Sequence, residues 1–186
     1  MSGTARALVV YESMFGNTQR IAAAIGEGLR PAFETEVLAV GQTPRTLPGD
    51  VRLLVVGGPT HAFGMSRPST RDQAAAQGPM VMPATTGVRE WLEMLGPRRT
   101  ETVAATFDTR VNKVRRLPGS AARAAARRLR HQEYEVIAAP ASFYVGDMTG
   151  PLDEGEVDRA RKWGEQLVIA QGSRPAGATH HHRRGH

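Results

Sequence analysis

The segment whose residue types and spacing are best suited to chemistry is Ser13-Met14-Phe15-Gly16-Asn17-Thr18. Binding a phosphate monoester requires many hydrogen-bond donors and little steric bulk. Ser13 and Thr18 supply hydroxyl groups, and Gly16 lets the backbone turn closely. A helix that begins here directs its unpaired first amides and the positive end of its dipole at the loop. The segment therefore predicts a phosphate-binding loop, and a turn that only caps the helix is the alternative interpretation.

The sequence excludes several other kinds of site. It has no G-x-x-x-x-G-K-[ST] motif, so the loop differs from that of the nucleotide hydrolases. It has no cysteine, which excludes disulfides, thiol catalysis, zinc–thiolate sites and iron–sulfur clusters as properties of this chain. Redox chemistry would have to come from an organic cofactor or from a metal held by nitrogen and oxygen. Nothing in the spacing of Glu12 and Asp147 supports an acid–base pair, and we predict neither a catalytic residue nor a metal site.

An alternation of short apolar runs and amphipathic stretches predicts the elements that position this loop. Continuous apolar runs suit the strands of a parallel sheet that is covered on both faces. The expected strands are 7–12, 36–40, 51–57, 102–107 and 135–139, and the expected helices are 17–30, 86–95 capped by Thr86, 120–131 capped by Ser120, and a last one capped by Asp153 with Glu156. A loop or short turn replaces the helix between the second and third strands. This order implies right-handed crossovers and a parallel sheet.

Ligands of such sheets bind beyond the carboxyl ends of the strands, so the loops at that edge are the expected site. The connection 58–84 is long and has no strong period, which is typical of functional or mobile loops. The segment 108–119 is expected to be a basic loop, and 140–152 is expected to be a loop as well.

The chain is strongly basic, with a formal net charge of +6 and a sequence pI of about 10.6. A basic surface favours acidic proteins, phosphates or nucleic acid as partners, and a charge that serves only solubility is the alternative. Arg123, Arg127 and Arg130 share one face of an expected helix, which either docks an acidic redox partner or is simply solvated. Nucleic acid is the weaker interpretation, because aromatic residues make up only 5% of the chain and none interleaves with the basic run.

One domain is expected over residues 1–172, a length that can bury most of the apolar side chains. Residues 173–186 are rich in Gly, Pro, Arg and His and predict a disordered basic tail. No apolar run approaches the ~20 residues that cross a membrane, so no membrane partner is expected. The first residues lack the apolar core of a signal peptide, and we expect a cytoplasmic protein.

The spacing around the first loop resembles that of one family position by position. The pattern is Val9-Val10-Tyr11-x-Ser13-x-x-Gly16-x-Thr18-x-x-x-Ala22-x-x-Ile25, which is similar to the signature of the flavodoxins. The resemblance implies a three-layer αβα sandwich whose five-stranded parallel sheet has the order 2-1-3-4-5. It also implies that Ser13, Met14, Phe15, Gly16, Asn17 and Thr18 hold the phosphate of FMN.

The same resemblance implies two further loops around the flavin ring. One follows the third strand and contains Pro59, Thr60, His61, Phe63 and Gly64, with Phe63 either stacked on the ring or packed under the long loop. The other follows the fourth strand and contains Phe107, Asp108, Thr109 and Arg110. Typical flavodoxins have a tyrosine here, and this sequence has none. Arg67, Arg71 and Arg110 are expected to flank the ring, where they either stabilise reduced flavin or an anionic substrate or are simply solvated.

Three functions are compatible with this sequence. The first is an FMN-binding electron-transfer protein whose redox partner is an acidic, ferredoxin-like protein. The second is an FMN-dependent oxidoreductase that acts on quinones or porphyrin-type substrates and is fed by NAD(P)H or a partner, with 64–84 forming part of a lid. The third is a binding module that keeps the fold without the flavin. Fold alone does not decide among them.

Overall fold

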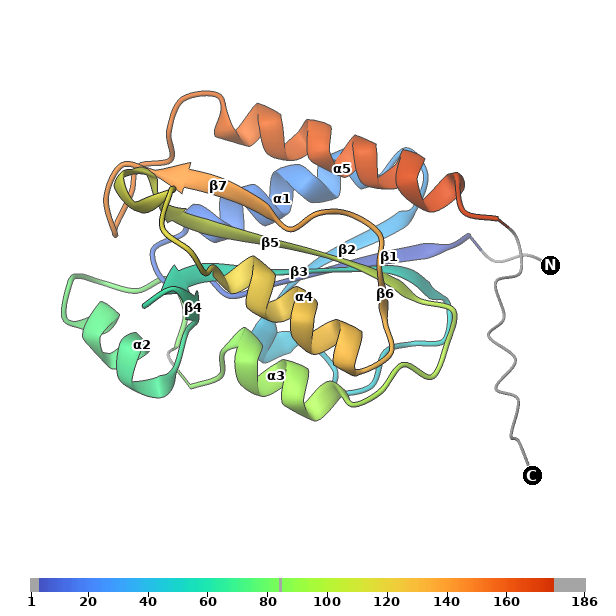
Figure 1. The fold of residues 1–186 in the computed structure, drawn as a ribbon, viewed down its shortest axis with the longest axis horizontal. Helices are drawn as coiled ribbons and strands as arrows, with labels where there is room; N and C mark the ends of the chain where they lie inside the picture. Colours follow the sequence, from blue (N-terminus) through green and yellow to red (C-terminus); the bar gives the residue numbers. More distant parts are fainter. Residues whose placement is uncertain (1–3, 84, 176–186) are drawn as a thin grey trace.

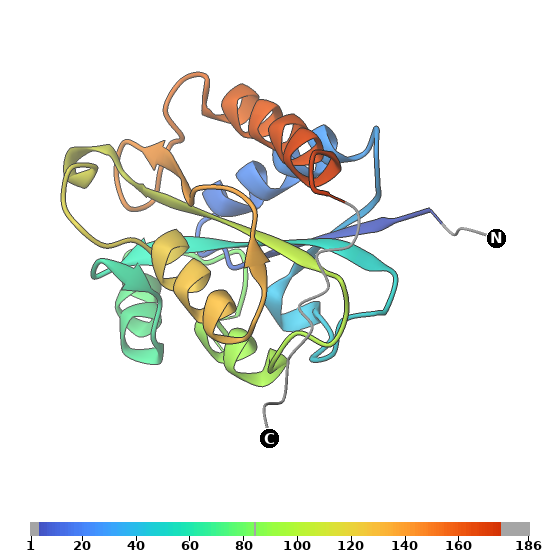
Figure 2. The same ribbon diagram turned by 45° about the vertical axis from the view of Figure 1, so that its right-hand side comes forward.

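The computed structural model describes residues 4–83 and 85–175 and has helices on both faces of a twisted, mainly parallel sheet (Figures 1 and 2). The strands are β1 (Arg6–Tyr11), β2 (Glu34–Ala39), β3 (Val51–His61), β4 (Gly64–Met65), β5 (Val103–Val111), β6 (Glu135–Val136) and β7 (Ala141–Val145). The sheet has the order β2-β1-β3-β5-β6, with β7 also pairing with β5 and β4 antiparallel to β3. The expected order 2-1-3-4-5 is therefore confirmed, and the fifth strand is divided into β6 and β7.

Two helices cover each face of this sheet. One face carries α1 (Asn17–Leu29) and α5 (Glu156–Gly172), and the other carries α3 (Val88–Leu95) and α4 (Ala121–His131). The inner strands are buried on both sides, so neighbouring residues of one strand pack into different cores: Leu53 and Val55 face one, and Leu54 and Val56 the other. This explains why these strands have continuous apolar sequences.

Helix α1 follows the loop that the sequence analysis singled out. Its apolar residues at helical spacing are all buried, namely Ile21, Ala22, Ile25 and Leu29. It packs closely on α5 because both helices have glycine at the crossing. A Cβ on Gly28 would lie 2.2 Å from the carbonyl oxygen of Arg161, and one on Gly164 would lie 2.5 Å from that of Ile25.

Two segments expected to be loops contain regular structure. Within 58–84, β3 continues to His61, and β4 and the short helix α2 (Pro68–Ala75) follow. The sequence did not predict α2, because this helix buries only Arg71 and Ala74 and has no apolar stripe. Within 140–152, β7 runs directly from Pro140, and its inward residues Phe143 and Val145 are buried. The basic loop is also shorter than expected, since β5 extends to Val111 and the short helix η2 (Asn112–Val114) follows.

The expected helix caps are correct for α4 and wrong for α3 and α5. Ser120 accepts a hydrogen bond from the backbone N–H of Arg123 at 3.1 Å, as expected of an N-cap. Helix α3 begins after Gly87, whose N–H donates to the Glu90 carboxylate at 2.9 Å, so Thr86 is not its cap.

At α5 the carboxylate of Asp153 accepts from Asn112 Nδ2 at 3.0 Å instead of capping the helix. The N-cap of α5 is Gly155, and the carboxylate of Glu156 accepts from the backbone N–H of Tyr144 at 2.7 Å. Between β2 and β3 the chain forms only the short helix η1 (Val40–Gln42), which confirms the missing helix.

Helix α5 ends at Gly172. Just beyond it, Arg174 forms an ion pair with Glu135 of β6. Most of the expected tail, 176–186, lies outside the described residues. Within the described ranges, no helix is long and apolar enough to cross a membrane.

Candidate functional site

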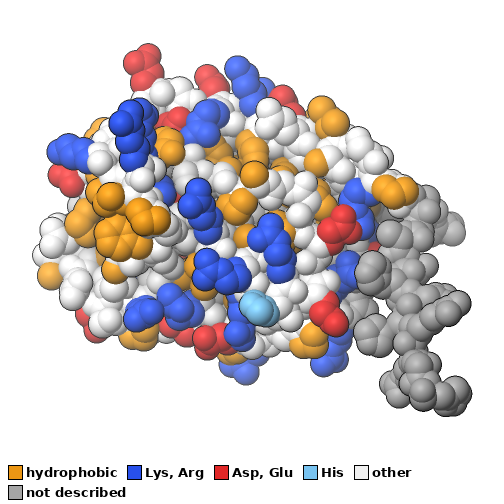
Figure 3. Space-filling model, in the orientation of Figure 1, with side chains coloured by type: hydrophobic (Ala, Val, Ile, Leu, Met, Phe, Trp, Pro, Cys, Tyr) orange, Lys and Arg blue, Asp and Glu red, His pale blue; other side chains and the backbone are white. Residues whose placement is uncertain are grey.

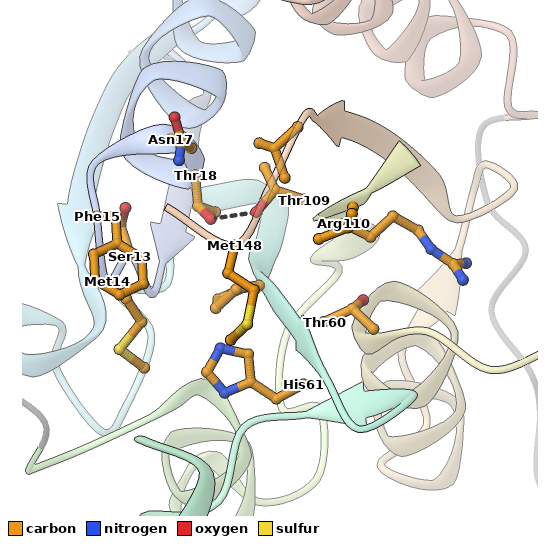
Figure 4. Close-up of a pocket in the computed structure, with 13 residues that line it drawn as sticks. Ser13, Met14, Phe15, Asn17, Thr18, Thr60, His61, Thr109, Arg110 and Met148 are labelled. Carbon is orange, nitrogen blue, oxygen red and sulfur yellow. Dashed lines mark hydrogen bonds between the residues drawn. The ribbon is translucent and has the colours of Figure 1, made fainter. Parts of the chain in front are cut away.

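A pocket opens at the carboxyl edge of the sheet, where the loop after β1 and the start of α1 meet the ends of β3, β5 and β7 and the loop after β7 (Figure 4). Its empty volume, including the part open to solvent, is about 460 Å³. The residues that line it are Ser13, Met14, Phe15, Asn17, Thr18, Pro59, Thr60, His61, Thr109, Arg110, Val111, Val145 and Met148.

The first loop forms the turn that a phosphate site requires. Gly16 is the N-cap of α1 and has a φ of +92°, a left-handed conformation that favours glycine. Its N–H donates to Ser13 Oγ at 3.1 Å, which fixes the Ser13 hydroxyl inside the turn. Asn17 and Thr18 are the first residues of α1, so the amides of the first helical turn begin at the pocket.

Two neighbouring segments hold this loop in place. The carbonyl of Met14 accepts a hydrogen bond from Val81 N at 2.8 Å. On the other side, Gly150 packs against Asn17 so closely that a Cβ there would lie 2.9 Å from the Asn17 amide group. The loop after β7 therefore reaches the phosphate-loop side of the pocket.

A buried hydrogen bond joins the start of α1 to β5 across the pocket. Thr18 Oγ1 and Thr109 Oγ1 lie 2.7 Å apart, and both side chains are buried (Figure 4). A hydroxyl can donate one hydrogen bond while accepting others, so this pair leaves each oxygen with further capacity. This bond fixes the relative position of Thr18, which was expected at the phosphate of FMN, and Thr109, which was expected at its ring.

The end of β3 contributes Pro59, Thr60 and His61 to the pocket, although the sequence predicted a loop here. Thr60 Oγ1 donates to Asp108 Oδ2 at 3.1 Å and accepts from Ala121 N at 2.9 Å, so it is fixed between β5 and α4. Burial, and secondarily the charge of Arg71, lower the pKa of His61 below its ordinary value. His61 is therefore a neutral, partly buried wall of the pocket at pH 7.

Two expected ring-loop residues lie outside this lining. Gly64 pairs with His61 in the antiparallel β3–β4 contact. Phe63 has a φ of +66° and a side chain that is 55% exposed, and its backbone packs against Gly119. The aromatic rings among the lining residues belong to Phe15 and His61.

The four residues expected in the loop after the fourth strand lie within β5; the first two are turned away from the pocket and the next two line it. Phe107 packs edge-to-face on Phe143 and Trp163, with centroids 6.4 and 6.3 Å apart, and its ring fills the space above Gly57. Asp108 is fully buried, and its Oδ2 accepts from the N–H of Ala122 in α4 at 3.0 Å. Thr109 and Arg110 line the pocket, as Figure 4 shows.

Arg110 links the pocket to the basic segment that follows β5. Its Nη2 donates to the carbonyls of Val114 and Leu117 at 2.8 and 3.2 Å. Its Nε is buried and has no hydrogen-bond partner among the described residues. In Figure 4 the guanidinium points away from Thr18 and Thr109, so Arg110 faces the pocket with the inner part of its side chain.

Arg71 belongs to a buried charge network rather than to the pocket wall. It is 1% exposed and forms an ion pair with Glu90 at 3.0 Å, and its Nη1 donates to Ser66 Oγ at 2.9 Å. The Ser66 hydroxyl donates in turn to Glu12, the residue after β1, whose other oxygen accepts from Val88 N at 2.8 Å. The network therefore connects the end of β1 to α2 and α3.

The two carboxylates of this network are shifted in opposite directions. Burial raises the pKa of Glu12, and the hydrogen bonds from Ser66 and Val88 offset only part of that effect. Burial also acts to raise the pKa of Glu90, but hydrogen bonds from Arg71 and from backbone N–H groups outweigh it and hold that pKa low. Because Glu90 and Glu12 both act on Arg71, its charge is largely compensated.

The sequence analysis missed Val111, Val145 and Met148 as lining residues. Val111 and Val145 pair with each other in β5 and β7, and the alternation of Ala141, Phe143 and Val145 was the available signal for β7. Met148 lies in an irregular loop, and no pattern marks it. Arg67 is exposed at the start of α2 and does not line this pocket.

The lining as a whole is suited to an anion attached to an apolar, planar group. It supplies the hydroxyls of Ser13, Thr18, Thr60 and Thr109 and the amide of Asn17, together with Arg110 and several apolar side chains, and no carboxylate. Among the described residues, no group of three or more His, Asp or Glu side chains is placed to hold a metal ion.

The arrangement of sheet, helices and edge loops defines a flavodoxin-like α/β protein. Solved structures with the same fold include a flavodoxin from the domain Archaea (TM-score 0.60, 17% identity, covering 90% of this chain and 99% of that one). Flavodoxin 2 from Bacillus cereus is equally similar (TM-score 0.60, 18% identity, 90% and 98%). A WrbA-like protein from Agrobacterium tumefaciens also matches (TM-score 0.53, 18% identity, 91% and 99%).

These matches confirm the resemblance at the level of the fold, over nearly the whole length of the chain. No protein-family model matches the sequence, and no curated protein matches it either.

Proposed function

We propose that this protein binds FMN in the pocket and acts as an electron-transfer protein. The observation that carries the proposal is the convergence of one loop and two strand ends on one cavity. The loop after β1 brings hydroxyls and the start of α1, and the ends of β3 and β5 bring Thr60, His61, Thr109 and Arg110. The similarity in fold to solved flavodoxins supports the same assignment.

The residues present fit this cofactor. A phosphate group can accept hydrogen bonds from Ser13, Thr18 and the first amides of α1, with the helix dipole adding favourable charge. Gly16 adopts a left-handed conformation and has no Cβ, so no side chain at this position obstructs the approach to these amides. No carboxylate in the lining would repel the phosphate.

FMN would supply the redox chemistry, and this chain would supply binding, orientation and electrostatics. Thr18 and Thr109, joined by their hydrogen bond, would keep the phosphate side and the ring side in a fixed relation. Neutral His61 would form part of the ring wall without adding charge. Arg110 would place a cation at the edge of the ring site, where added electron density is stabilised.

A second candidate, an FMN-dependent oxidoreductase, is favoured by one observation. A second cavity, whose empty volume including the part open to solvent is about 440 Å³, is also lined by His61 and contains Arg67, Arg89, Ser69 and Thr70 in its lining. Because His61 lines both cavities, a small anionic substrate there would lie next to the flavin. The substrate classes compatible with the sequence analysis, quinones and porphyrin-type compounds, would both have to be tested.

The visible spectrum of the purified protein, followed by stepwise photoreduction, tests the first proposal and separates it from the second. A bound flavin that accumulates a one-electron-reduced state and reacts slowly with NADPH and quinone supports the electron-transfer protein. Rapid NADPH oxidation that depends on added quinone supports the oxidoreductase instead. A protein that remains colourless and does not take up added FMN contradicts both.

A further inference from the structure

A continuous run of positive charge follows β5 and occupies the surface beside the pocket. Between Asp108 and Glu133 the sequence contains no acidic residue. The exposed cations of this run are Lys113, Arg115, Arg116, Arg123, Arg127, Arg128 and Arg130. None of them forms an ion pair within the described ranges, whereas Arg6, Arg71, Arg159, Arg161 and Arg174 all do. We call this set the basic face.

The basic face is held in place by the fold. Helix α4 is capped by Ser120 and buries its alanines and Leu129 against the sheet, so its arginines necessarily point outward. The segment before it is tied to the pocket by Arg110, which binds the carbonyls of Val114 and Leu117. The cations on both segments therefore have a defined position relative to the pocket.

An apolar patch lies at the pocket end of the basic face. Phe63 is 55% exposed and Leu117 is 45% exposed, and Phe63 packs on Gly119, two residues after Leu117. Figure 3 shows an apolar area on this side of the molecule, between η2 and β4, with Lys and Arg side chains beside it and over α4. An apolar centre with a charged rim is the usual composition of a protein–protein interface.

The patch is directly connected to the proposed flavin site. Phe63 follows His61 of the pocket lining by two residues, and Leu117 is bound through its carbonyl to Arg110 of the same lining. Met148, which is 51% exposed, lies at the pocket itself. A protein seated on the patch would therefore lie next to the flavin.

We infer that the basic face and the patch of Phe63 and Leu117 together dock an acidic electron-transfer protein, whose contact area has an apolar centre surrounded by Asp and Glu. The inference rests on the proposed function, because the partner exchanges electrons with a flavin in the pocket. Charge complementarity identifies the partner class: uncompensated cations attract an acidic surface and steer its approach. Nucleic acid fits less well, because no Phe, Trp or Tyr lies within 108–133 to stack on bases.

Binding to an acidic plant-type [2Fe–2S] ferredoxin, measured by calorimetry with the flavin-loaded protein, tests the inference. The double variant Arg115→Glu/Arg116→Glu reverses two charges beside Leu117. The matched control Arg30→Glu/Arg45→Glu makes the same net change at two exposed arginines, one just after α1 and one between η1 and β3. We expect the Kd to rise about tenfold or more in the first variant and much less in the control. Raising the salt concentration from about 50 to about 300 mM should also raise the Kd of the wild type.

Two further probes make the result decisive. Basic cytochrome c should bind the double variant better than the wild type, and a short DNA duplex should bind the wild type more weakly than the ferredoxin does. Equal losses in variant and control, binding of ferredoxin that does not depend on salt, or tighter binding of the duplex would overturn the inference. Absorbance at 450 nm reports the flavin independently, so loss of flavin with retained ferredoxin binding would count against the proposed function and not against the docking surface.

Discussion

Thr18 Oγ1 lies 2.7 Å from Thr109 Oγ1, which joins the first turn of α1 to the end of β5 across the pocket. These residues are far apart in the sequence and belong to the two loops that the resemblance assigned to the phosphate and the ring. Their contact makes one rigid site from two separate segments. It also fixes the Thr18 hydroxyl while leaving it capacity for a further hydrogen bond, which the proposed phosphate would use.

Replacing Thr18 by alanine should weaken FMN binding by about 1–3 kcal/mol, because a charged acceptor loses one donor and Thr109 loses its partner. Fluorescence titration of the apoprotein with FMN measures the change, and thermal unfolding of the apoprotein shows whether the fold is retained. Thr18→Ser keeps the hydroxyl and should bind almost as the wild type does. An unchanged Kd in Thr18→Ala would show that this hydroxyl does not contact the phosphate.

The buried network of Glu12 predicts a specific dependence of stability on pH. Burial raises the pKa of Glu12 in the folded state, so folding favours its protonated form. Its contribution to stability is complete below its unfolded pKa of about 4.3 and is lost as the pH rises through the higher folded value. Glu12→Gln should therefore gain stability relative to the wild type as the pH rises above about 4.3.

Urea unfolding of both proteins at a series of pH values between about 4 and 8 measures this difference. Glu90→Gln is the control, because the pKa of Glu90 is lowered and its contribution has the opposite sign, being lost as the pH falls. A difference between the wild type and Glu12→Gln that stays constant with pH would contradict the assignment.

Arg110 should make the bound flavin easier to reduce. A cation about 8 Å from the ring, in an effective dielectric of about 20, attracts an added electron by roughly 2 kcal/mol, and solvent and salt would halve this. Arg110→Ala should therefore lower the potential for the second electron by about 40 mV. Spectroelectrochemistry measures it, with the charge-preserving Arg110→Lys as the control. An alanine variant with the wild-type potential would exclude Arg110 from this role.

The crossing of α1 and α5 should tolerate no side chain at Gly28. A Cβ there would lie 2.2 Å from the carbonyl oxygen of Arg161, so the helices must move apart. We expect Gly28→Ala to lower the free energy of unfolding by about 1–3 kcal/mol. Gly172→Ala, at the end of α5 with open space around it, should change stability little. Equal effects at the two positions in denaturant unfolding would contradict this packing.

Much of the fold was predictable because the apolar runs of β1, β3 and β5 are buried on both faces and therefore stand out. The spacing from Ser13 to Thr18 pointed to the pocket, because the residue types of that turn, with Gly16 at a positive φ, are readable in the sequence. Helix α2 could not be predicted in this way, because it buries a charged residue, Arg71, in place of an apolar stripe.

Contacts between distant segments could not be predicted from the sequence either. The Arg71–Glu90 pair and the approach of Arg110 to the carbonyl of Leu117 depend on how loops fold over the sheet edge. These contacts decide the roles of two arginines that the sequence analysis treated alike. The structure places Arg71 in a compensated, buried network and Arg110 beside the pocket.

The most direct test of the account compares FMN and riboflavin as ligands of the wild-type apoprotein, by fluorescence titration under identical conditions. The two differ only in the phosphate that the loop from Ser13 to Thr18 and the start of α1 should hold. We predict one FMN per chain and an affinity for riboflavin that is lower by about tenfold or more. Equal affinity for the two flavins, or no binding of either, would contradict the proposal that this pocket is an FMN site.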